Sequence, residues 1–242
     1  SEEEELDKLL KEYERVVREI EEKLDRVKRD IERLVEEITR DLRRVLEEYR
    51  KVVEELAKDE GDTSEILDTD MKIVEDLLRL LKEILDKILK LIEDALRVLK
   101  EVLKRDTDIV RRIIEILRRG VSEKDLKEIL DRWEEENKKL LEEIKKILDK
   151  VRDDVRKLVE EVRKALEDWK RTLEDLLRKE GQESDTARRI ERLSREVIKK
   201  LEKALKELED LVREVLRRLK EAVEEIHKLS RDVIKMLTDA TR

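Results

Sequence analysis

Apolar residues return to equivalent positions every eighteen residues along this chain. Three leucines share one such position and three valines share another: Leu6, Leu24 and Leu42, and Val17, Val35 and Val53. The apolar steps within a repeat are 3, 4, 3, 4 and 4 residues. Eighteen residues over five turns is about 3.6 per turn, the period of an undistorted α-helix, whereas a heptad repeat averages about 3.5 and imposes a left-handed supercoil. The spacing therefore predicts long helices that pack nearly straight.

The composition fits ordered helices. Charged residues make up 54% of the chain and hydrophobic residues 38%. Such a charge content also occurs in disordered chains, but here Leu, Ile and Val stand at helical spacing and can be buried together. Apolar runs are too short for a membrane span or a signal-peptide core. We therefore expect a soluble, untargeted protein without a natural localisation, cytoplasmic in an expression host.

Charge and residue usage argue against several functions. The net charge is -8, and basic residues alternate with acidic ones, which disfavours nucleic-acid binding. The absence of Cys excludes disulfides and thiolate chemistry. Three isolated glycines cannot form a phosphate-binding loop or a dinucleotide fingerprint. The sequence therefore predicts no enzyme and no cofactor.

Three turns divide the chain into four helices. Gly61, Gly120 and Gly181 follow helix ends, and start signals come after each, such as Ser122 three residues before Asp125. The predicted helices span residues 2–59, 64–118, 122–179 and 184–241. Each would be about 85 Å long. Short connections make neighbours antiparallel, so we predict an all-α, single-chain, up-down-up-down four-helix bundle forming one domain over residues 1–242.

Polar and aromatic residues interrupt the apolar stripes in pairs that are thirty-six residues apart. These pairs are Tyr13 and Tyr49, Asp70 and Asp106, Trp133 and Trp169, and Ser194 and Ser230. Folding the chain at its turns predicts two layers about 54 Å apart. One layer contains Tyr13, Asp106, Trp133 and Ser230, and the other contains Tyr49, Asp70, Trp169 and Ser194. The equivalent central positions are Ile31, Ile88, Val151 and Val212.

A carboxylate explains this grouping, because buried Trp N–H and Tyr O–H groups need acceptors. We interpret the layers as register devices, since a slipped pairing would leave their donors without partners. A general base is the less favoured reading of each Asp. Asn137 also occupies a stripe position, where it either extends the nearby layer or faces water near the helix end.

The single histidine belongs to a Glu224-x-x-His227 sequence, which matches half of a di-iron motif of helical bundles. Its position relative to the repeat places His227 on the solvated face, and no second such motif occurs. A metal site needs several convergent ligands. The sequence therefore predicts no metal site.

The segment 64–118 is apolar over about half its circumference, a wider face than the other segments have. The extra apolar residues are Leu67, Leu78, Leu85, Leu89, Leu96, Leu103 and Ile114. Burial in the bundle is the favoured explanation, and weak self-association through this segment is the alternative. We otherwise expect a monomer that binds no nucleic acid, membrane or other partner.

The eighteen-residue stripe in all four segments, the Gly-plus-Ser/Asp turns and the Leu/Ile/Val core under a Glu/Lys/Arg surface are shared with one class of proteins. The chain resembles the de novo, parametrically designed antiparallel four-helix bundles with untwisted helices. That resemblance covers the whole chain and implies high stability and no natural activity. The alternative is an apolipoprotein-like amphipathic protein that binds lipid surfaces or partner helices.

Overall fold

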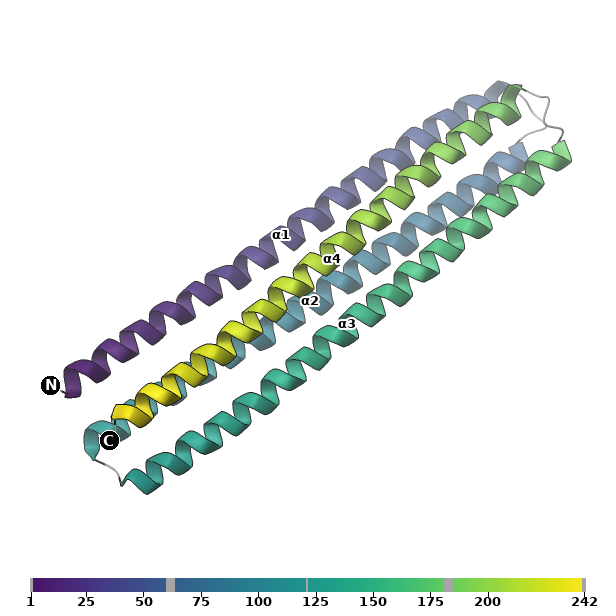
Figure 1. Ribbon diagram of the computed structural model, residues 1–242. Coiled ribbons are helices and arrows are strands. Elements are labelled where there is room, and N and C mark those ends of the chain that lie inside the picture. The colour runs from purple at the N-terminus through teal and green to yellow at the C-terminus, as the bar shows by residue number, and fades with distance from the viewer. Residues whose placement is uncertain (1, 60–63, 121, 181–184, 241–242) are drawn as a thin grey trace. The chain divides into compact units, whose positions relative to one another are not determined.

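The computed structural model describes residues 2–59, 64–120, 122–180 and 185–240. Its helices are α1 (Glu2–Asp59), α2 (Ser64–Arg119), α3 (Glu123–Glu180) and α4 (Asp185–Ala240), shown in Figure 1. These bounds agree with the predicted ones to within one residue. The predicted all-α, up-down four-helix bundle is confirmed. Some side chains near helix ends, that of Asp70 among them, lie outside the described residues.

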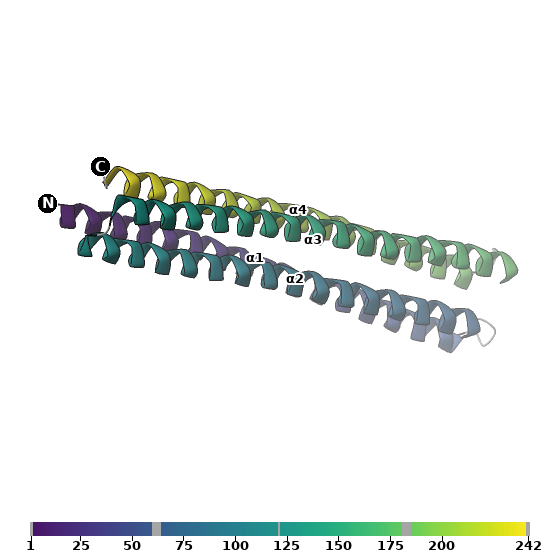
Figure 2. The ribbon, with the colours of Figure 1, turned by 90° about the horizontal axis from the view of Figure 1, so that it is seen from below.

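The structure divides into two compact units, and each contains a segment of every helix. The first unit comprises Ser1–Asp30, Leu91–Arg152 and Glu214–Arg242, and the second comprises Ile31–Lys90 and Asp153–Arg213. Within each unit α1 runs beside α2, and α3 beside α4 (Figure 2). The assignment of residues 1–242 to a single domain stays a prediction, and so does the straightness of the helices.

Ion pairs show that α1 and α2 are antiparallel. The pairs between them are Asp7–Arg118, Glu14–Arg111, Asp25–Lys100 and Arg50–Glu75. In all four pairs the two residue numbers add up to 125, so a step forward along α1 is matched by a step back along α2. Helices α1 and α2, which follow one another in the sequence, are therefore antiparallel neighbours, as a short connection requires.

The same reasoning places the other neighbours. Three pairs join α1 to α4 with residue numbers that add up to 248: Lys23–Glu225, Asp30–Arg218 and Glu48–Lys200. Arg105 of α2 pairs with Glu136 of α3 at 2.7 Å. In the second unit, Arg163 of α3 pairs with Glu209 of α4 at 2.7 Å. Helix α1 thus has α2 and α4 as neighbours, and α3 has the same two.

The apolar stripes, rather than these ion pairs, hold the helices together. Leu6, Leu24 and Leu42 are all buried, and so are Val17 and Val35, while the side chain of Val53 lies outside the described residues. Burying one such side chain contributes about 1.5–3 kcal/mol. An exposed ion pair contributes about 0–1 kcal/mol. The core therefore dominates the stability, and the ion pairs mainly select partners and register.

The wide apolar face of α2 is largely covered. Leu85, Leu96, Leu103 and Ile114 are all buried, which agrees with the favoured explanation for them. Leu78 and Leu89 are half-buried, and the side chain of Leu67 lies outside the described residues. Self-association through α2 stays an untested prediction.

The turn between α2 and α3 has the predicted caps. Gly120 has φ +78°, the left-handed conformation that glycine adopts without strain, and its N–H donates to the Leu117 carbonyl at 3.3 Å. Ser122 Oγ accepts the Asp125 backbone N–H at 3.4 Å, so Ser122 is the N-cap of α3. The turns containing Gly61 and Gly181 lie outside the described residues.

Candidate functional site

The first unit contains a buried polar cluster centred on Asp106 of α2. Asp106 is buried, with 2% of its surface exposed. Trp133 of α3 donates its Nε1–H to Asp106 Oδ1 at 3.2 Å, and Asn137, one turn further along α3, donates from Nδ2 to Asp106 Oδ2 at 3.1 Å. The four-residue spacing puts both α3 donors on one face of that helix. Two donors from one helix therefore hold both carboxylate oxygens.

Ser230 of α4 completes the cluster across the bundle. Its Oγ accepts a hydrogen bond from Asn137 Nδ2 at 3.1 Å. The same hydroxyl lies 3.0 Å from the Ile226 carbonyl and 3.4 Å from Asp106 Oδ2, either of which can accept its hydrogen. Asn137 is thus buried and links Asp106 to Ser230, which resolves the alternatives that the sequence left open.

Tyr13 of α1 is also buried but has a different partner. Its pKa lies above the ordinary value, because burial and the nearby Asp106 charge disfavour the phenolate, while the Thr107 hydroxyl acts in the opposite direction. Thr107 in turn donates to the Leu103 carbonyl at 2.8 Å. The sequence did not single out Thr107. The sequence feature that could have indicated Thr107 is its position directly after Asp106.

The repeat explains why these polar residues point inward. The cluster, with Tyr13 included, consists of Tyr13, Asp106, Trp133, Asn137 and Ser230. The positions one repeat away from these five residues are all apolar and buried: Ile31, Ile88, Val151, Val155 and Val212. Polar side chains at such positions must satisfy one another, since an unpaired buried polar group costs about 1–3 kcal/mol. Among the described residues, every buried side-chain nitrogen and oxygen has a hydrogen-bond partner.

Burial dominates the electrostatics of Asp106. It raises the pKa of this carboxyl to about 6, from an ordinary 3.8. Hydrogen bonds from Trp133 and Asn137, and from Ser230 when its hydroxyl turns to the carboxylate, favour the charged form. The charge of Arg105 acts in the same direction. These contributions are smaller than the desolvation.

The second predicted layer is described in part. Tyr49, Trp169 and Ser194 are all buried in the second unit. The side chain of Asp70 lies outside the described residues, so its place among them stays a prediction.

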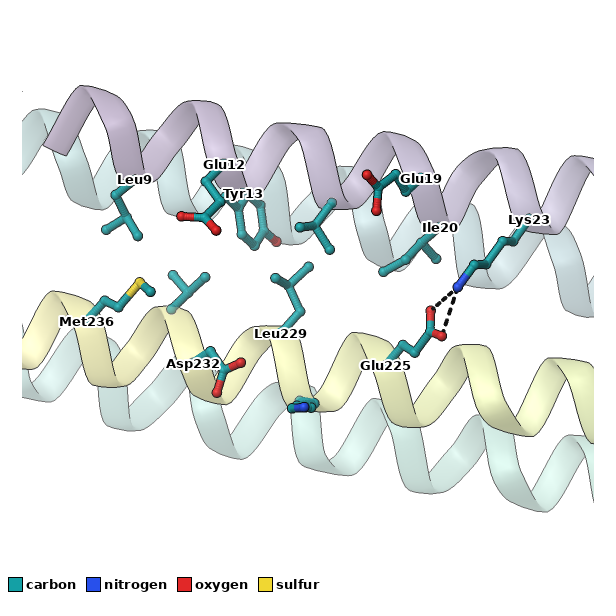
Figure 3. A pocket seen from close by; sticks show the side chains of 13 residues that line it. Leu9, Glu12, Tyr13, Glu19, Ile20, Lys23, Glu225, Leu229, Asp232 and Met236 are labelled. Atoms are coloured by element: carbon teal, nitrogen blue, oxygen red, sulfur yellow. Dashed lines mark hydrogen bonds and ion pairs between the residues drawn. The ribbon is translucent and has the colours of Figure 1, made fainter. Parts of the chain in front are cut away.

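A surface groove of about 370 Å³ lies between α1 and α4 in the first unit. Figure 3 shows Leu9, Tyr13 and Ile20 of α1 facing Leu229 and Met236 of α4. Lys23 and Glu225 form an ion pair at one end, at 3.0 Å. Apolar walls with charged edges are the usual result of two amphipathic helices meeting side by side.

The Glu224-x-x-His227 sequence was considered above as half of a metal-binding motif. The His227 side chain is half-buried rather than fully solvated. Burial lowers its pKa, and the charges of Arg231 and Lys145 add to that effect. Within the described ranges, no group of three or more His, Cys, Asp or Glu side chains is placed to hold a metal ion.

The buried cluster joins α2, α3 and α4 by hydrogen bonds, and its carboxyl can bind a proton. None of the described helices is long and apolar enough to cross a membrane. Comparisons with protein-family models, curated proteins and solved structures found no match. Fold and cluster together define an all-α, up-down four-helix bundle with a buried polar layer.

Proposed function

We propose that this chain is a de novo designed structural protein, a scaffold whose function is to fold into a highly stable bundle of nearly straight helices. It carries out no catalysis, binds no cofactor and needs no partner. In an expression host we expect it to remain in the cytoplasm.

The recurrence of the same contact along the helices carries this proposal. Asp7–Arg118 and Asp25–Lys100 join α1 to α2, and they are eighteen residues apart on both helices. Asp30–Arg218 and Glu48–Lys200 repeat at the same interval between α1 and α4. A single geometry with a single repeat, applied throughout, produces such recurrence.

The distribution of apolar side chains supports a scaffold over a lipid-binding protein. A protein that opens onto a lipid surface has a large apolar face available. Among the described residues, the large apolar side chains classed as exposed are Ile147 and Met236, at 44% and 46%. The wide apolar face of α2, which a lipid-binding protein could present to a lipid surface, is largely buried.

Vesicle binding distinguishes the two functions. The full chain is mixed with vesicles of phosphatidylcholine alone and of phosphatidylcholine with phosphatidylserine, and binding is measured by flotation. The near-ultraviolet circular dichroism of Trp133 and Trp169 reports packing at the same time, because both indoles are buried. If the chain is a scaffold, it does not float with either kind of vesicle, and its near-ultraviolet circular dichroism is unchanged.

Flotation with either vesicle, accompanied by loss of the near-ultraviolet signal, would overturn the scaffold proposal and favour the lipid alternative. Flotation only with the anionic vesicles, with the signal retained, would also contradict a scaffold without partners, because it would show a surface that binds lipid headgroups.

A further inference from the structure

The hydrogen-bond capacity of the Ser230 hydroxyl is central to the Asp106 cluster. This hydroxyl has one hydrogen and two acceptor lone pairs. The Ile226 carbonyl lies 3.0 Å away and Asp106 Oδ2 lies 3.4 Å away, so the hydrogen has its better acceptor within α4 itself. One lone pair accepts Asn137 Nδ2 at 3.1 Å. The remaining lone pair is then available to Asp106.

The Asn137 amide cannot adjust in the same way. Its Nδ2 has two hydrogens, and it donates one to Asp106 Oδ2 and the other to Ser230 Oγ, each at 3.1 Å. Trp133 supplies one further hydrogen, to Oδ1. The carboxylate therefore has two fixed donors, and its neighbour Ser230 presents an acceptor.

We propose that Asp106 is a proton-binding site of the folded bundle and that Ser230 accepts the hydrogen of the bound proton. A proton from water adds to Asp106 Oδ2, and the new O–H donates to Ser230 Oγ. The Ser230 hydroxyl continues to donate its own hydrogen to the Ile226 carbonyl. An O–H bond of a hydronium ion breaks as the O–H bond on Oδ2 forms, water is released, and the carboxyl changes from charged to neutral with every donor still paired.

The groups around Asp106 allow it to titrate alone. From α1, Tyr13 stays neutral, because its pKa lies above the ordinary value. On α2 itself, Arg105 is the charged neighbour, and it pairs with Glu136 of α3 at 2.7 Å, which offsets its charge. From α4, Ser230 faces the carboxyl without a charge. Burial raises the pKa of Asp106 to about 6, where both forms are accessible in the folded protein.

The indole N–H of Trp133 reports this equilibrium, because it donates directly to Asp106 Oδ1. The experiment follows the two indole N–H resonances of the ¹⁵N-labelled full chain from about pH 4.5 to pH 8, with assignment by Trp133→Phe. We expect the Trp133 resonance to titrate with a single midpoint near pH 6 while far-ultraviolet circular dichroism stays constant. Asp106→Asn should abolish the transition.

A Trp133 resonance that does not move, or one that moves equally in Asp106→Asn, would overturn the proton site. Ser230→Ala tests the acceptor, and an alanine is well tolerated in a helix. Loss of an acceptor destabilises the protonated form, so the midpoint should fall by about half a pH unit or more. A rise would show that Ser230 acts as a donor to the carboxylate. Ser194→Ala, the equivalent change in the second unit, should leave the midpoint unchanged.

Discussion

At the scale of single residues, the Asp106 cluster balances a buried charge against hydrogen bonds. Two fixed donors, from Trp133 and Asn137, reach the carboxylate, yet desolvation remains the largest influence on it. A buried polar group of this kind adds little net stability, while removing one partner leaves the others unpaired. We therefore interpret the cluster as a device for specificity, because a slipped register of α2 and α3 would separate Asp106 from both α3 donors.

Removing Asp106 alone should therefore cost more than removing the whole cluster. We expect Asp106→Ala to lower the free energy of unfolding by about 1–3 kcal/mol, because it leaves the Trp133 and Asn137 donors unpaired. The matched variant takes residues from one repeat away: Tyr13→Ile, Asp106→Ile, Trp133→Val, Asn137→Val and Ser230→Val. That variant should be near neutral. Denaturant unfolding at pH 5 measures both, and equal losses would contradict the register interpretation.

The raised pKa of Asp106 makes stability depend on pH. A carboxyl with a pKa of about 6 in the folded state and 3.8 as its ordinary value binds its proton more tightly when folded. Its contribution is complete below about pH 4 and is lost as the pH rises through 6. The full difference is about 3 kcal/mol.

Asp106→Asn isolates this effect, because an amide imitates the protonated carboxyl at every pH. Relative to the unsubstituted chain, this variant should gain up to about 3 kcal/mol in free energy of unfolding between pH 4 and pH 8. Unfolding curves at both pH values give the comparison. A stability difference that does not change with pH would show that Asp106 has an ordinary pKa in the folded state.

The sequence located the residues of the cluster more readily than their partners. Asp106, Trp133 and Ser230 interrupt an apolar repeat, so their burial and proximity followed from position. Asn137 was ambiguous because a stripe position near a helix end is compatible with either water or core. Thr107 does not interrupt the stripe, and its relation to Tyr13 depends on side-chain packing that a repeat does not specify.

At the scale of helices and turns, charge order distinguishes registers that the core leaves equivalent. Glu14–Arg111 and Arg50–Glu75 lie thirty-six residues apart on α1 and on α2, with the acidic and basic partners exchanged. Sliding one helix by two repeats in one direction would bring Glu14 to Glu75, and sliding it by two repeats in the other direction would bring Arg50 to Arg111. Like charges facing one another are unfavourable, so these pairs oppose that slip.

The α2–α3 turn depends on one backbone conformation. We expect Gly120→Ala to lower the free energy of unfolding by about 1–2 kcal/mol, because an L-residue is strained at φ +78°. The space around Gly120 is open, with nothing within 4 Å of an added Cβ, so the cost arises from the backbone alone. Gly120→Asn should cost less, since Asn tolerates this conformation. Equal losses in the two variants, measured by denaturant unfolding, would implicate the side chain instead.

The helix bounds could be predicted from the sequence, because the apolar repeat continues to the end of each helix and a glycine follows each of the first three helices. The prediction for α1 and the observed helix both cover residues 2–59. The coverage of Leu85 or Leu103 was less certain from sequence, because a wide apolar face fits either a central helix or an interface. The structure shows that both side chains are buried.

At the scale of the whole molecule, the proposed scaffold requires the chain to fold into one highly stable bundle. Each unit contains one buried tryptophan, Trp133 in the first and Trp169 in the second. The variants Trp169→Phe and Trp133→Phe therefore report the two units separately. If residues 1–242 form one cooperative domain, both fluorescence transitions should coincide with the loss of helicity. Separate midpoints would contradict a single domain.

Unfolding in guanidinium chloride at 25 °C, followed by circular dichroism, measures the stability that the scaffold proposal requires. A fully packed core of Leu, Ile and Val over four long helices should give a midpoint above about 5 M, the range of hyperstable proteins. A midpoint at low denaturant would contradict the scaffold account, because it would indicate a loosely packed bundle that opens readily.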